Sequence, residues 1–200
     1  MEGITLVMAW FDKVKTCFAW DKADQARIAE LRRWMDSDAD EVVENLGQQL
    51  VQFKDVQPLM TNVRFVQRLH DVLREWLMDL LGGIFDEAYV KKRWAFGRKL
   101  AEIDLSFEDM ILLEGLARKQ LFELTRARLD GQPHVLSSTM HALDKALNFD
   151  MALIYSSYLQ VRDAEMERAL LERFLSITGF SRTLYESLAD AHEWNERNRA

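Results

Sequence analysis

The chain has 200 residues, of which 48% are hydrophobic and 30% are charged, an ordinary balance for a water-soluble globular domain. Its net charge of −7 disfavours nonspecific binding to nucleic acid or to an anionic membrane, and no apolar run approaches the ~20 residues that a membrane span needs. A single cysteine, Cys17, excludes an internal disulfide, and the N-terminus lacks the basic flank of a secretion signal, so we expect a cytoplasmic protein.

Hydrophobic spacing is helical nearly throughout the chain, and only 8 glycines and 2 prolines interrupt it. The first strong pattern covers residues 22–35, and the next starts after Asp38 or Asp40, either of which can cap a helix. Pro58 marks a break before residues 62–81, which carry one broad apolar arc and end at the pair Gly82-Gly83.

The second half of the chain continues in the same way with a helical pattern over residues 87–102. Ser106 and Asp109 form a capping box before an apolar run that reaches residue 124. After the loop at 131–133, a helical pattern starts at Ser137 or Ser138 and persists to about Thr178, an unusual length for a globular helix. A final amphipathic helix follows Gly179. No alternating strand of useful length is present, so the sequence predicts an all-α fold of ~8 helices.

The most informative motif lies between Trp76 and Leu105 and reads WLMDLLGGIFDEAYVKKRWAFGRKLAEIDL. It resembles the bacterial sensor globins, that is, globin-coupled sensors and protoglobins. Residues 18–35 look like the N-terminal helices of that family, and residues 145–162 look like its last helix, with Lys145, Asp150 and Tyr158 in characteristic places. The positions that match the central motif are Trp76, Leu77, Leu80, Leu81, Gly83, Phe85, Asp86, Tyr89, Arg93 and Gly97.

The resemblance implies a globin-like sensor domain at residues 20–175, with an N-terminal extension at 1–19 and a C-terminal connector helix at 176–200. In that family the residue three after the glycine is the proximal histidine that holds heme iron, and here it is Leu100. The family's distal Phe-Tyr pair matches Leu46-Gly47, which removes the phenol that bonds oxygen. The chain therefore looks like the heme-free family members found in bacterial stress-signalling complexes and sporulation regulators.

Helical geometry predicts the direction of the Leu100 side chain, which stands where the family has its proximal histidine. At 100° per residue, Phe96 and Leu100 share the apolar side of their helix, so we expect Leu100 to be buried and to face the helix that carries Leu46. Gly47 is compatible either with close helix packing or with room for a ligand. Without heme, we expect the interior to collapse onto bulky residues such as Phe65, Leu69, Trp76, Phe96 and Leu100, with a smaller residual apolar pocket for a small apolar ligand. The residues expected around this pocket are Leu46, Gly47, Phe65, Leu69, His70, Trp76, Phe96, Gly97 and Leu100.

A heme-free sensor would respond to a small apolar ligand or a protein partner. Two other functions are alternatives to it, a heme-binding gas sensor and an enzyme. A heme-binding gas sensor would need a displaced ligand, for which His70 is the reasonable candidate because it borders the apolar arc of its helix. An enzyme would need a constellation that the sequence lacks, since no P-loop, dinucleotide motif or nucleophile with a nearby base is present. We therefore expect no catalytic residues, no metal site and no cofactor, with heme as the alternative.

The long C-terminal pattern predicts a homodimer. Apolar residues recur at helical intervals, and a lone helix does not leave such a stripe in water without a penalty. Two copies would bury it as a four-helix seam with the helix at 106–128, and the paired helices would relay the signal to a C-terminal output domain or signalling partner. The residues expected in this interface are Leu143, Leu147, Ile154, Tyr158 and Val161.

Overall fold

The computed structural model describes residues 2–52 and 56–188, and within these ranges it contains helices and no strand. The predicted all-α class is confirmed. Residues 182–188 are also helical, and the rest of the expected connector, 189–200, lies outside the described residues. The elements with defined bounds are α1 (Glu2–Cys17), α2 (Lys22–Met35), α3 (Ala39–Leu50), η1 (Leu59–Thr61), α4 (Val63–Leu80), α5 (Glu87–Glu102), α6 (Phe107–Arg128) and α7 (Pro133–Thr178).

Polar residues just before the helices hold their first turns. The side chains of Asn62, Asp86 and Ser106 accept hydrogen bonds from the backbone amides of α4, α5 and α6, respectively. Asp21 and Asp24 form a reciprocal capping box at the start of α2. These caps satisfy amides that have no partner within the helix, which explains why the helices begin at these residues.

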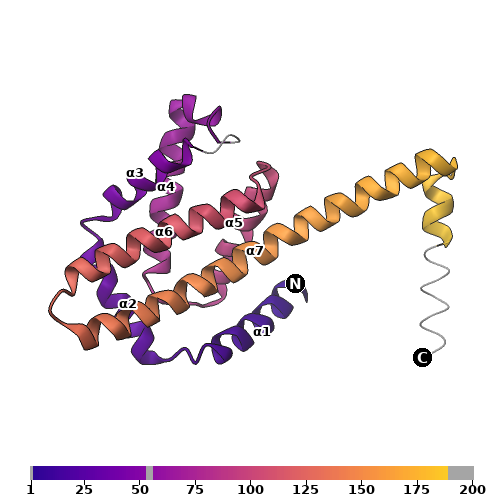
Figure 1. The fold of residues 1–200 in the computed structure, drawn as a ribbon. Coiled ribbons are helices and arrows are strands. Elements are labelled where there is room, and N and C mark those ends of the chain that lie inside the picture. The colour runs from indigo at the N-terminus through magenta and orange to yellow at the C-terminus, as the bar shows by residue number, and fades with distance from the viewer. Residues whose placement is uncertain (1, 53–55, 189–200) are drawn as a thin grey trace. The chain divides into compact units, whose positions relative to one another are not determined.

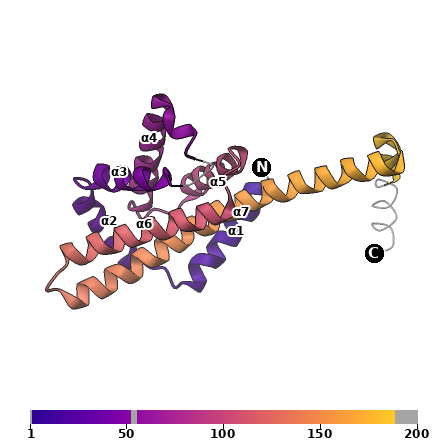
Figure 2. The ribbon, with the colours of Figure 1, turned by 45° about the horizontal axis from the view of Figure 1, so that its top comes forward.

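The chain divides into two compact units, residues 1–158 and residues 159–200. In the first unit, α3 packs against both α4 and α6. Helices α6 and α7 run side by side in opposite directions (Figures 1 and 2). Ion pairing between Arg118 and Asp144 and packing of Phe107 against Tyr155 tie these two helices together.

The first helix contributes to the same core instead of forming a separate extension. The ring of Phe11 is fully buried and meets Phe149 of α7 edge to face at 5.8 Å. Trp20 and Phe85 approach the same Phe149 ring at 5.3 and 5.4 Å. Edge-to-face contacts of this kind add to the energy of area burial, so α1 is anchored to the core that α7 crosses.

The expected dimer seam requires correction. Leu143, Leu147, Ile154 and Tyr158 are at most 3% exposed, because the helices of the first unit enclose them. They form the core of this chain's own fold and have no surface to offer a second copy. Val161 alone of the five is partly exposed, and it belongs to the second unit.

The second unit places the end of α7 against residues 182–188. The ring of Phe174 contacts Phe180 and Tyr185 at centroid distances of 6.1 and 6.4 Å, across a turn in which Gly179 has a positive φ of 72°. Apolar side chains nevertheless remain on its surface, among them Leu170 and Ile177, which are 61% and 75% exposed. None of the described helices is both long enough and apolar enough to span a bilayer.

Candidate ligand cavity

A buried polar cluster holds α4, α5 and α7 together beside the cavity. Asp150 is fully buried, and its carboxylate accepts hydrogen bonds from Trp76 Nε1 at 2.6 Å, from the Tyr89 hydroxyl and from Arg93 Nε. Arg93 also donates to the carbonyl of Trp76 at 2.8 Å. Four matches to the family pattern thus have a structural role, since each satisfies a group that would otherwise be buried without a partner.

Burial and the neighbouring charges in this cluster shift the pKa values of Tyr89 and Arg93. Burial raises the pKa of Tyr89 well above its ordinary value, and the negative charge of Asp150 raises it further. Burial alone would lower the pKa of Arg93, but Asp150 and Tyr89 raise it above its usual range overall. The guanidinium also lies 4.6 Å from the centre of the Tyr89 ring. The cluster is therefore a directly paired carboxylate and guanidinium, with a neutral phenol that donates to the same carboxylate.

Gly97 lies where α5 crosses α7, and this corrects its expected place in the pocket. A Cβ at this position would collide with the Ser157 hydroxyl and with the carbonyl of Ile154. Ser157 also donates a hydrogen bond across the crossing, from its Oγ to the carbonyl of Trp94 at 2.8 Å. Glycine here permits close helix approach, and Gly97 lines none of the cavities described below.

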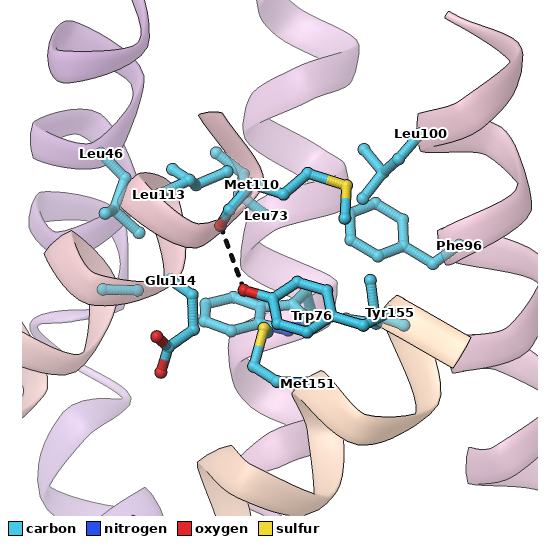
Figure 3. Close-up of a pocket in the computed structure, with 12 residues that line it drawn as sticks. Leu46, Leu73, Trp76, Phe96, Leu100, Met110, Leu113, Glu114, Met151 and Tyr155 are labelled. Atoms are coloured by element: carbon cyan, nitrogen blue, oxygen red, sulfur yellow. Dashed lines mark hydrogen bonds between the residues drawn. The ribbon is translucent and has the colours of Figure 1, made fainter. Parts of the chain in front are cut away.

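Two apolar pockets that share part of their lining lie against α5, and they are called the inner and the outer lobe. The inner lobe, of about 40 Å³, is enclosed by α3, α4, α5, α6 and α7 (Figure 3). The outer lobe, of about 400 Å³, lies between α4, α5 and the start of α6. Its size falls within the ~300–1,000 Å³ of small-molecule sites. Both lobes are lined by Leu73, Phe96, Leu100 and Leu113, which therefore form the wall between them.

Leu100 is half-buried, not fully buried as its helical position suggested, because the outer lobe leaves one side of it uncovered. It lines the inner lobe together with Leu46, so the expected orientation toward α3 is found. Figure 3 shows Leu100 and Phe96 projecting from α5 toward Met110. The residue at the family's ligand position therefore separates the two lobes.

The predicted pocket residues fall into three places. Six of the nine line the two lobes, and Gly97 lies at the helix crossing. Gly47 and His70 line a separate depression of about 250 Å³ between α3 and α4, where Leu69 also contributes a wall. An added Cβ at Gly47 would meet no atom within 4 Å, so Gly47 is not a close-packing site. The six in the lobes are Leu46, Phe65, Leu69, Trp76, Phe96 and Leu100.

Several lining residues were missed because they lie on helices that the sequence motif does not reach. Met151 and Tyr155 enter the inner lobe from α7, and Met110 and Glu114 enter it from α6. Their spacing of four residues on each helix was visible in the sequence, but periodicity identifies a buried face without saying whether it lines a cavity. Burial raises the pKa of Tyr155 to about 12, with the negative charge of Glu114 adding to the shift.

Comparison with known proteins identifies the fold and the family of this chain. Among solved structures, the chain matches the globin domain of a globin-coupled sensor from Geobacter sulfurreducens with a TM-score of 0.69. The match covers 74% of this chain and 96% of that chain at 14% sequence identity, so it shows a shared globin fold. A family model described as Protoglobin matches residues 8–164, and the chain belongs to that family. No curated protein matches.

Membership in this family implies heme, and the residues around the cavity do not fit it. Among the described residues that line the two lobes, none is a histidine. The thioethers of Met110 and Met151 reach only the inner lobe, whose 40 Å³ cannot hold a macrocycle. Tyr155 likewise lines only the inner lobe. His70 is 39% exposed and lines the separate depression instead.

Proposed function

We propose that this chain is a heme-free signal-sensing domain that takes a small apolar ligand into the outer lobe. The observation that carries the proposal is the position of Leu100. It occupies the place of the family's iron ligand, and it borders an apolar space of about 400 Å³ instead of filling it. The absence of a ligating side chain removes the protein's principal hold on heme, while the remaining space keeps the size of a ligand site.

The helix that would meet the ligand also crosses α7 at close range. Helix α5 carries Leu100 and crosses α7 at Gly97. The segment that follows α5 is also tied to α7, where the Tyr158 hydroxyl donates to the carbonyl of Leu105 at 2.8 Å. Tyr158 is the last residue of the first compact unit. A ligand that displaces Phe96 or Leu100 would push α5 against α7, and we infer that the signal leaves the domain along α7 toward an output domain or a signalling partner.

Hemin titration with visible absorption tests the heme-free state. We expect the purified chain to show no ligated Soret band, because no histidine among the described residues lines either lobe. The Leu100→His variant should gain such a band, whereas Leu100→Ala, which opens the same space without adding a ligand, should not. A strong Soret band in the unmodified chain that disappears in His70→Ala would contradict the proposal and identify a heme sensor with a displaced ligand.

A further inference from the structure

Two basic side chains stand at the edge of the outer lobe, one on each of its facing helices. Arg68 comes from α4 and Lys99 from α5, and both line a lobe whose other walls are almost entirely apolar. Both residues are exposed, and neither has an acidic partner among the residues that the structure describes. Two other cations of the same helices do have acidic partners, since Arg74 meets Asp40 at 2.8 Å and Lys92 meets Glu75 at 3.0 Å.

We propose that the outer lobe binds an amphipathic monoanion, whose apolar body fills the lobe and whose anionic group pairs with Arg68 and Lys99. This inference rests on the proposed function, because it concerns the ligand of the same cavity. Arginine presents several N–H donors in a fork that matches the two oxygens of a carboxylate, and lysine adds a second positive charge from the opposite wall.

The charges around the lobe favour this ligand over a neutral or cationic one. Among the described residues that line the lobe, Glu102 is the only acidic one, and against Arg68 and Lys99 it leaves a net charge of +1. Lys99 lies in the last turn of α5, where its charge also interacts favourably with the helix dipole. Arg68 lies in the first half of α4, away from the C-terminal carbonyls of its own helix, and its forked guanidinium makes it the principal partner for a carboxylate.

Isothermal titration calorimetry of the full chain with three ten-carbon probes tests the proposal. Decanoate, decan-1-ol and decylamine share one apolar body and differ in the charge of the head group. We expect decanoate to bind most tightly and decylamine most weakly. The double variant Arg68→Gln/Lys99→Gln should weaken decanoate binding by about tenfold, the size expected for two partly exposed charge pairs, and should leave decan-1-ol unchanged.

A matched variant controls for the loss of two positive charges. Arg64→Gln/Lys91→Gln removes the same charge from the same two helices, at exposed residues that do not line the lobe, and should leave the affinity for decanoate at the parent value. Equal binding of decanoate and decan-1-ol, or equal losses in both double variants, would overturn the anion site and leave the apolar ligand site standing. Failure of both decanoate and decan-1-ol to bind would instead overturn the proposed small-molecule function, and this inference with it.

Discussion

Gly97 illustrates how one residue sets the distance between two helices. The Gly97→Ala variant should be destabilised by ~1–3 kcal/mol, because the added methyl group meets backbone and hydroxyl atoms of α7 that cannot retreat without moving the helix. Urea unfolding measures the effect. Gly115→Ala is the matched control, since nothing lies within 4 Å of its added Cβ, and it should stabilise the chain by up to ~1 kcal/mol. Similar effects of the two substitutions would contradict the close crossing of α5 and α7.

Tyr155 makes stability depend on pH in the alkaline range. Its pKa in the folded chain is about 12, against an ordinary value of 10.0, so the unfolded chain loses this proton first. The stabilisation is therefore fully present below pH 10 and is lost as the pH rises toward 12. We expect the melting temperature of the parent to fall over this interval and that of Tyr155→Phe to fall less. Tyr89 keeps part of the dependence, because its pKa is also raised. Identical profiles would contradict the burial of the Tyr155 phenol.

Among the elements, α4, α5 and α7 depend on one carboxylate for their mutual attachment. Asp150→Asn should lower the free energy of unfolding by ~3–5 kcal/mol, because it removes the closest counter-charge of the buried Arg93 and leaves only the more distant carboxylate of Asp79, 3.9 Å from Arg93 Nη1. Asp144→Asn breaks the ion pair with Arg118, but the Asp144 side chain is 48% exposed, and the expected cost is only ~0–1 kcal/mol. Chemical denaturation of both variants measures the difference. A small loss for Asp150→Asn would mean that Arg93 finds another partner.

At the scale of the whole molecule, the homodimer stays a prediction, but its interface is now expected on a different surface. The second unit exposes a stripe of apolar residues on the last part of α7, with Met166, Leu170, Phe174 and Ile177 each at least 44% exposed. Intervals of three and four residues place them on one side of the helix, as in a coiled-coil seam. We expect sedimentation at micromolar concentration to give a dimer, and we expect Leu170→Glu/Ile177→Glu to give a monomer.

The control for this interface is Arg168→Glu, which lies on the opposite side of the same helix at 100° per residue and is exposed. It adds negative charge without touching the stripe, so it should leave the dimer intact. If the parent sediments as a monomer, the dimer and the relay through paired helices both fail. Dissociation by Arg168→Glu as well would indicate that charge, and not the apolar stripe, governs association.

Helix bounds and the missing iron ligand were readable in the sequence because both depend on local information. The 3.6-residue period predicted helices at 22–35 and 87–102, which are the bounds of α2 and α5. The capping serine at 106 and the glycine at 179 marked the ends of elements correctly. The identity of Leu100 needs only the motif around it. Globin membership likewise followed from the order of the motifs, and the family match bears it out.

Tertiary structure decided which apolar side chains meet one another and which meet a cavity. An apolar stripe on α7 has the same period whether its own chain or a second copy covers it, so Leu147 and Ile154 were misassigned to a dimer seam. His70 and Leu100 both lie on the apolar sides of their helices, yet the crossing of α3 and α4 places His70 at a different depression. The site depends on contacts between residues distant in sequence, and periodicity along one helix contains no information about them.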